Sequence, residues 1–359
     1  MSLLWMDYEA EFKNLVDTSH QIEEEANAAY FAGLDERVRK IIYRDTRYNV
    51  DFLYTAYVLK DSKVIQDYAV WLYELMASVL KNRTRLETVD YVIGHLEYIK
   101  EGAKRTVSED KLPEILKLIE NAQESIREYV KDPKKPEVKE SLYEAQIHEY
   151  MEILLEKNTR KALALIKQFT DQGIPATTVY VEILAESMRR VGELWHTAKI
   201  SVDTEHYCTS VTQMAMAQMY PMIFSDTRKD RTLLCACPGT ELHEIGARMV
   251  VDVFENDGWD GIFLGAAVPE EYLMKAIREN KPDLVALSVT MPQHLMVCAD
   301  LVKKIKEEFP DMKVAVGGGA FKSTHEIWKK WPVDIYSEDA RELLARANEM
   351  VRRENERFQ

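Results

Sequence analysis

The chain has 359 residues and a mass of 41.7 kDa, enough for two or three domains of ordinary size. Apolar residues make up 46% and charged residues 30%, which excludes global disorder. The formal net charge of −14 repels phosphate backbones and disfavours direct nucleic-acid binding. No run reaches the about 18 to 20 apolar residues of a membrane span, and the first residues lack the basic region of a signal peptide. We therefore expect a cytoplasmic protein with no membrane role.

Residues 1–131 carry apolar side chains three and four positions apart, as at Ile65, Tyr68, Ala69 and Leu72, which predicts an all-helical domain. Residues 1–130 hold 17 Lys and Arg against 24 Asp and Glu, a net charge of −7, so this domain lacks the dense basic face of a DNA reader. Its role is open: an output module, a dimerisation bundle or a second sensor. A proline- and lysine-rich segment, residues 131–136, predicts a linker after it.

Residues 138–228 are again helical in pattern. Asn158 or Thr159 is a possible helix cap, Pro175 lies near the start of a third helix, and Ser201 opens a fourth. Four helices of this length predict a four-helix bundle.

Residues 231–359 show short β-rich runs that alternate with helical stretches. The runs are 232–237, 261–265, 284–289, 313–316 and 333–336. Such alternation predicts an α/β doubly wound domain with five parallel strands, of the flavodoxin-like, Rossmann type. The complete fold class is therefore multidomain: an all-α N-terminal domain, a helical bundle and this sheet.

Ligands of open α/β sheets bind beyond the carboxyl ends of the strands, so the residues that follow each strand matter most. The first strand is followed by Glu241, His243 and Gly246 in the pattern Glu-x-His-x-x-Gly. The carboxylate can accept the second ring N–H of the histidine and raise its basicity as a metal ligand. Ser288 and Thr290 follow the third strand, and Gly317, Gly318 and Gly319 follow the fourth. The glycines let a ligand or another backbone pass close to the sheet.

In this order and spacing, with 41 residues between Gly246 and Ser288 and 26 between Thr290 and Gly317, the motifs resemble the cobalamin-binding domain family. That family includes methionine synthase, corrinoid methyl carriers and adenosylcobalamin mutases. The resemblance covers roughly residues 231–350. It implies that His243 is the lower ligand of cobalt. It also implies that the displaced nucleotide tail runs into the sheet beside Ser288, Thr290, Gly317 and Gly318.

Two positions depart from the commonest pattern of this family. Glu241 stands where aspartate is usual, and Thr290 stands where leucine is usual. We expect the longer side chain of Glu241 to lengthen the contact between carboxylate and histidine and to weaken its effect on cobalt.

The helical bundle has a signature of its own. Met188-x-x-Val191-Gly192-x-x-Trp195 precedes the pair Glu205-His206, with nine residues between Trp195 and Glu205. The pattern places Trp195 at the end of one helix and the pair in the first turn of the next, where a tryptophan core anchor and a capping glutamate are the plain interpretation.

The signature, however, is similar to the helical cap of light-sensing adenosylcobalamin regulators of the CarH type. That resemblance implies that Trp195 packs against the adenosyl group and that Glu205 lies near its ribose or base. It further implies that His206 becomes the upper cobalt ligand after photolysis. Those regulators carry a DNA-binding module that residues 1–131 do not resemble, so DNA binding is not carried over.

The other histidines fit no metal spacing. We expect His20, His95 and His148 on helix surfaces. His294 and His325 follow the third and fourth strands, where a solvated loop is the expected setting and contact with the corrin the alternative.

The leading hypothesis is a cobalamin-binding sensor or signalling protein, not a turnover enzyme, with adenosylcobalamin favoured over methylcobalamin or hydroxocobalamin. The main alternative is a corrinoid carrier that shuttles methyl groups between partner methyltransferases. A third possibility is a cobalamin-binding structural subunit. The expected readout is a protein partner of residues 1–131 or a homo-oligomer.

Overall fold

The computed structural model describes residues 10–133, 141–224 and 227–357. The chain divides into two compact units. The helical unit comprises residues 1–135, 291–296 and 320–327, and the sheet-containing unit comprises 136–290, 297–319 and 328–359. Part of the expected linker, residues 134–136, lies outside the described residues. None of the helices within the described ranges combines the length and apolar character that a bilayer crossing requires.

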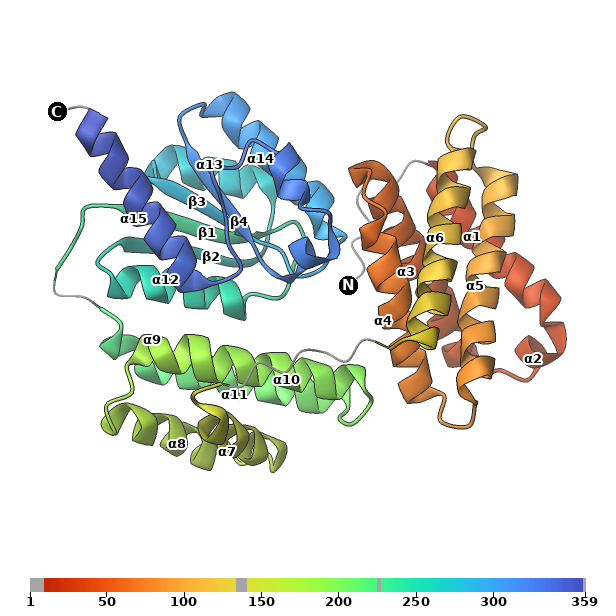
Figure 1. Ribbon diagram of the computed structural model, residues 1–359, viewed down its shortest axis with the longest axis horizontal. Helices are drawn as coiled ribbons and strands as arrows, with labels where there is room; N and C mark the ends of the chain where they lie inside the picture. The colour runs from red at the N-terminus through yellow and green to blue at the C-terminus, as the bar shows by residue number, and fades with distance from the viewer. Residues whose placement is uncertain (1–9, 134–140, 225–226, 358–359) are drawn as a thin grey trace. The chain divides into compact units, whose positions relative to one another are not determined.

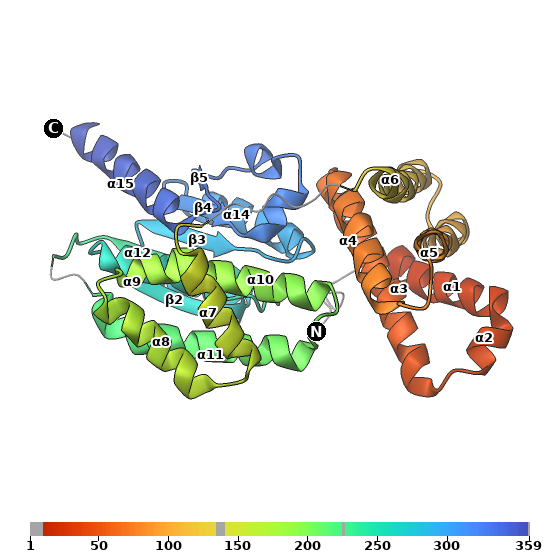
Figure 2. The ribbon, with the colours of Figure 1, turned by 60° about the horizontal axis from the view of Figure 1, so that its bottom comes forward.

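Among the described residues the helical unit is built on six helices, two of which begin with side-chain caps. Asp35 Oδ1 accepts the N–H of Val38 at 2.9 Å, and Thr84 and Glu87 form a reciprocal capping box. Figure 2 shows α5 and α6 nearly end-on beside α4. The helices are α1 (Ala10–Ala26), α2 (Ala28–Ala32), α3 (Glu36–Leu59), α4 (Lys63–Val79), α5 (Arg85–Thr106) and α6 (Leu112–Lys131). They enclose one continuous apolar core.

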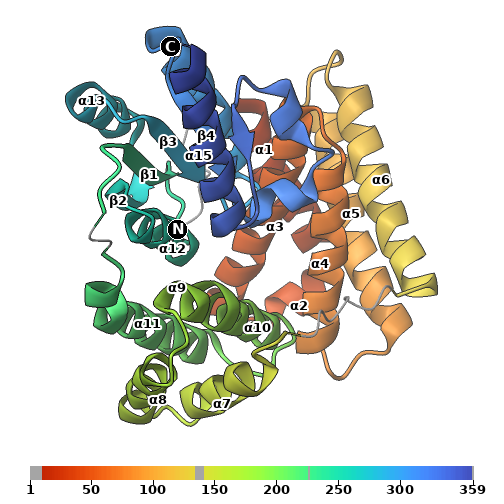
Figure 3. The same ribbon diagram turned by 60° about the vertical axis from the view of Figure 1, so that its left-hand side comes forward.

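A helical bundle opens the sheet-containing unit. Asn158 Oδ1 accepts the N–H of Lys161 at 3.1 Å, and Pro175 precedes the third helix, as expected. That third helix is continuous but includes a π-helical stretch, η2 (Val179–Leu184). The other elements are α7 (Glu144–Leu155), α8 (Thr159–Asp171), α9 (Ala176–Thr178), α10 (Ala185–His196), α11 (Val202–Met219) and η3 (Tyr220–Met222). Figures 1 and 3 both show α10 and α11 lying between the pair α7 and α8 and the sheet.

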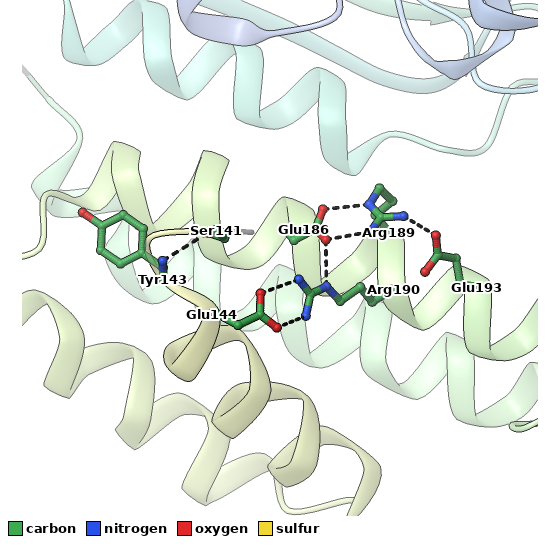
Figure 4. Close-up of polar contacts among 7 residues, drawn as sticks. All are labelled: Ser141, Tyr143, Glu144, Glu186, Arg189, Arg190 and Glu193. Atoms are coloured by element: carbon green, nitrogen blue, oxygen red, sulfur yellow. Dashed lines mark hydrogen bonds and ion pairs between the residues drawn. The ribbon is translucent and has the colours of Figure 1, made fainter. Parts of the chain in front are cut away.

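An ion-pair network fixes α7 against α10 within the bundle. The guanidinium of Arg190 makes two bonds of 2.6 and 2.7 Å to the carboxylate of Glu144, and a third of 2.7 Å to Glu186 (Figure 4). The bonds from Arg190 hold the pKa of Glu144 below the ordinary glutamate value, and the bond from Arg189, with a smaller contribution from Arg190, does the same for the pKa of Glu186. Arg189 also pairs with Glu186, but it lies further from the α7 contact (Figure 4). Arg190 therefore joins two helices, whereas Arg189 pairs within one.

The second half of the unit is a five-stranded parallel sheet in the order β2-β1-β3-β4-β5. Its strands are β1 (Thr232–Pro238), β2 (Asp260–Val268), β3 (Leu284–Ser288), β4 (Lys313–Gly317) and β5 (Ile335–Tyr336). The longer connections are α12 (Ile245–Asn256), α13 (Glu270–Asn280), α14 (His294–Glu308) and α15 (Ala340–Arg357), with η4 (Gly319–Ser323) and η5 (Ile327–Lys330) between β4 and β5. Helices α12 and α15 cover one face of the sheet, and α13 and α14 the other (Figure 1).

This strand order is the flavodoxin-like one, so the predicted fold class is confirmed. Two predicted histidine settings are wrong. His95 is buried, with Nδ1 3.1 Å from Oε2 of Glu23, and His294 is buried at the start of α14 instead of lying in a solvated loop. His20 is half-buried, and burial lowers its pKa. His148 lies on the helix surface as expected.

We expect Arg190→Met to lower the free energy of unfolding by about 1 to 2 kcal/mol, because it removes charge-assisted bonds between helices from a side chain that is 17% exposed. Arg189→Met is the matched control. Its side chain is 52% exposed and pairs within one helix, so it should cost less than about 0.5 kcal/mol. Urea unfolding followed by circular dichroism measures both. Equal losses would contradict the assignment.

Candidate functional site

The loop after β1 places a buried carboxylate at the carboxyl edge of the sheet. Oε1 of Glu241 accepts the backbone N–H of His243 at 3.0 Å and lies 2.6 Å from Nδ1 of the same residue. Oε2 accepts the N–H of Thr290, just beyond β3, at 2.9 Å. The backbone carbonyl of Glu241 accepts the N–H of Ala267 in β2 at 2.8 Å. One fully buried side chain therefore ties the loop after β1 to the end of β3, and its backbone ties the same loop to β2.

This contact orients the imidazole of His243. An ionised carboxylate only accepts hydrogen bonds, so Nδ1 carries the proton and Nε2 carries the free lone pair. The hydrogen bond to Glu241 raises the pKa of His243, burial acts in the opposite direction, and the charges of Glu241 and Glu205 add to the increase. The side chain is 56% exposed, which leaves the ring open to a ligand. The 2.6 Å separation shows that the expectation of a lengthened contact at Glu241 is wrong.

Four of the residues singled out in the sequence line one cavity of about 250 Å³. These residues are Gly246, Ser288, Gly317 and Gly318. The cavity lies between the sheet, α12 and α15, and it also touches Val181 and Ala185 of the bundle. Thr290 and Trp195 do not belong to its lining. The structure therefore groups the predicted tail-binding residues, except for Thr290, whose backbone bonds to Glu241 instead.

Two of the glycines serve different purposes. A Cβ on Gly246 would meet nothing within 4 Å, so this position leaves open space along the cavity wall. Gly318 has φ of +102°, and a Cβ there would lie 2.3 Å from the carbonyl oxygen of Val289. Close approach of another backbone, one of the two reasons considered for the glycine run, therefore accounts for Gly318.

The bundle contributes a second histidine–carboxylate pair. Glu205 and His206 lie in the first turn of α11, where Oε2 of Glu205 is 2.6 Å from Nδ1 of His206. The hydroxyl of Thr209 donates to Oε1 of Glu205 at 2.8 Å. His206 is exposed, and Trp195 is half-buried at the end of α10. Since the charge of Glu205 helps to raise the pKa of His243, this end of the bundle lies near the loop after β1.

Polar contacts that the sequence analysis missed also join the bundle to the sheet. Gln213 of α11 donates to Glu244 at 3.2 Å, and the other oxygen of Glu244 accepts the N–H of Ala266 at 3.0 Å. Arg341 of α15 donates to Glu182 at 2.9 Å and to Thr178 at 3.0 Å. The position of Glu244, directly after His243, could have indicated that it belongs to the site. Nothing in the sequence indicates a role for Gln213 or Arg341.

A buried ion pair lies beside these contacts, next to a second cavity of about 330 Å³ between α11 and α12. Asp252 lies 2.9 Å from Nε of Arg248, whose guanidinium stacks over the ring of Tyr220. Burial raises the pKa of Asp252 to about 6, although the charge of Arg248 opposes the change. The contact region between bundle and sheet therefore contains a carboxyl group that titrates near neutral pH.

Among the described residues, no group of three or more His, Cys, Asp or Glu side chains is arranged to hold a metal ion. His243 supplies a single nitrogen, which suits a metal whose remaining ligands come from a bound cofactor.

The comparisons with known proteins agree with this site. Two family models, each described as a B12 binding domain, match residues 231–345 and 146–220. The chain is 27% identical over 166 residues to the HTH-type transcriptional repressor CarH of Myxococcus xanthus, a match that covers 46% of this chain and about half, 54%, of the repressor. It is 22% identical over 211 residues to dimethylamine corrinoid protein 3 of Methanosarcina acetivorans, covering 58% of this chain and 98% of that protein.

A solved structure shows the same fold. The monomethylamine corrinoid protein of Methanosarcina barkeri superposes with a TM-score of 0.51 at 20% identity, over 58% of this chain and 99% of that one.

We expect Glu241→Gln to lower the pKa of His243, because the substitution removes the main cause of its increase and leaves burial, which acts in the opposite direction. A pH titration of the His243 ring by NMR on the cofactor-free full chain measures the change. Glu308→Gln, which removes an exposed carboxylate that pairs with Arg278, is the control. An unchanged titration in Glu241→Gln would contradict the orientation argued for the ring.

We expect Asp252 to make stability depend on pH. Its folded pKa of about 6 exceeds the unfolded value of 3.8, so its contribution is complete below pH 3.8 and is lost as the pH rises through 6. The loss is on the order of 3 kcal/mol. Asp252→Asn cannot ionise and should remove this part of the pH dependence. Urea unfolding of both proteins at pH 4.5 and pH 7.5 measures the difference, and parallel pH profiles would refute the expectation.

Proposed function

Since the chain belongs to the cobalamin-binding family, which its B12 binding domains show, we propose that it is a light-responsive sensor with His243 as the lower ligand of cobalt. The observation that carries the ligand assignment is the pairing of Nδ1 of His243 with the buried Glu241. This pairing leaves Nε2 available for a metal at the carboxyl edge of the sheet. Cobalamin binding follows from the family, whereas the form of the cofactor and the use made of it are proposals.

The site residues fit a base-off cobalamin. A bound corrin would supply the other nitrogen ligands of cobalt, so His243 would need to supply only one imidazole nitrogen. The cavity lined by Gly246, Ser288, Gly317 and Gly318 is the candidate for the nucleotide tail, because Gly246 leaves its wall open. Glu241 keeps the proton on Nδ1 of His243 and thereby keeps Nε2 available.

The sensor hypothesis depends on the bundle. Bound adenosylcobalamin supplies a cobalt–carbon bond that light breaks. Glu205 holds Nδ1 of His206 as Glu241 holds Nδ1 of His243, so both imidazoles have Nε2 free for a metal. We assign His206 as the conditional upper ligand, and Trp195 and Glu205 as neighbours of the adenosyl group. The match to the CarH repressor supports this assignment.

A corrinoid methyl carrier is the second candidate. The match to dimethylamine corrinoid protein 3 supports it, because that match spans 98% of the relative. In this case the bundle protects cobalt between transfers, the cofactor is methylcobalamin, and a partner methyltransferase is required. Residues 1–131 would serve a protein partner or self-association.

Light responsiveness is tested on the full chain loaded with adenosylcobalamin in the dark and then exposed to green light. We expect the absorption spectrum to change to that of a stable photoproduct, and His206→Ala to alter that photoproduct because the upper imidazole is lost. His148→Ala is the control, since His148 is an exposed histidine on α7.

No stable photoproduct, or the same photoproduct in His206→Ala, would end the sensor proposal. Transfer of a methyl group to or from the bound cobalt would then favour the carrier.

A further inference from the structure

The helical unit contains a second buried carboxylate that holds a histidine through both its backbone and its ring. Oδ2 of Asp61 accepts the N–H of His325 at 2.7 Å, and Oδ1 lies 2.7 Å from Nδ1 of the same residue. Oδ1 also accepts the N–H of Lys63 at 3.1 Å, at the start of α4. The side chain of Asp61 is 1% exposed. Asp61 therefore binds the segment around His325 to the first turn of α4 in a water-excluded place.

Further contacts hold the same two short segments, residues 291–296 and 320–327, in the helical unit. Nζ of Lys63 donates to the carbonyl of Lys322 at 2.5 Å. Phe321 is buried, and Met291 packs against the core formed by the helices. Asp61 and Lys63 therefore bind the segment 320–327, and the helical core packs against Met291 of the segment 291–296. Both segments are far from α4 in the sequence.

Both segments are covalently joined to the candidate cofactor site. Met291 follows Thr290, whose N–H donates to the carboxylate that orients His243. Residue 320 follows the glycine run, in which Gly317 and Gly318 line the cavity and Gly318 lies against the backbone of Val289. The cavity and the bond to Glu241 are therefore at most three residues away from the segments 291–296 and 320–327. A displacement of Glu241, or of the strand ends around the cavity, is transmitted along the chain to these segments.

We propose that residues 10–131 read the state of the cofactor site through these two segments of their own chain, with the contact between Asp61 and His325 as the coupling element. The inference rests on the proposed function only in that cobalamin binds at His243. It gives the helical domain a defined partner surface, namely the first turn of α4 together with residues 291–296 and 320–327. The same surface serves a light sensor and a methyl carrier.

The test is hydrogen–deuterium exchange with mass spectrometry on the full chain, with and without hydroxocobalamin, a form that needs no illumination. We expect loading to change the exchange rate at least twofold in peptides that cover the start of α4 and residues 320–327. Asp61→Asn, which removes the carboxylate, should abolish the response at α4, and His325→Ala, which keeps the backbone bond to Asp61, should reduce it. The absorption spectrum of the bound corrinoid should stay as in the wild type in both variants.

His325→Ala guards against misfolding, because the ring of His325 is largely exposed and its loss leaves the contact between Asp61 and Lys63 intact. Glu114→Gln is the matched control. It breaks the exposed pair with Lys60, next to Asp61 in the chain, without touching either segment.

An unchanged exchange rate at α4 in a chain whose spectrum shows bound corrinoid would overturn the coupling and leave the proposed function standing. A response that persists in both variants would also overturn it. Failure of the corrinoid to bind would overturn the proposed function and this inference together.

Discussion

The candidate site depends on the burial of one carboxylate. Glu241 is fully buried, and a charge in that position is tolerated only where donors surround it. The donors are the ring and backbone N–H of His243 and the backbone N–H of Thr290. Because these groups come from two different strand ends, the cost of leaving the charge unpaired holds both ends in register. The same bonds place the proton on Nδ1 of His243 and fix the orientation of its ring. The buried carboxylate of Glu241 therefore determines both the stability of this edge of the sheet and the geometry of the ligand.

The sequence predicted what is local or periodic. The strands and the bundle helices follow from hydrophobic periodicity, and the pairing of Glu241 with His243 follows from two residues at spacing two. The rule that ligands bind at the carboxyl ends of parallel strands correctly grouped Ser288 with Gly317. The expectation that glutamate in place of aspartate lengthens this contact is wrong, because the fully buried side chain of Glu241 lies 2.6 Å from Nδ1 of His243.

The contacts that join distant segments could not be predicted. Asp61 and His325 are 264 positions apart, and Glu23 and His95 meet across two helices, so no spacing rule applies to either pair. Asp252 occupies an ordinary position in an amphipathic helix, and only the packing of the bundle on α12 buries it. A single sequence shows which residue types are able to pair. Tertiary packing decides which of these residues meet and which are buried.

The buried carboxylate of Asp61 also bears on the charge of the helical domain. Its net charge of −7 over residues 1–130 argues against a surface that reads DNA, but a count of charges says nothing about those that are buried. Asp61 is one of the 24 acidic residues in that count, and its buried carboxylate accepts the backbone N–H groups of Lys63 and His325. Salt screens interactions between exposed charges that lie more than about 8 Å apart at physiological ionic strength, and water competes with an exposed pair such as Lys60 with Glu114. The carboxylate of Asp61 is 1% exposed, so the bonds that it accepts from the backbone N–H groups of Lys63 and His325 are screened less than such surface pairs, whereas the ring of His325 is exposed.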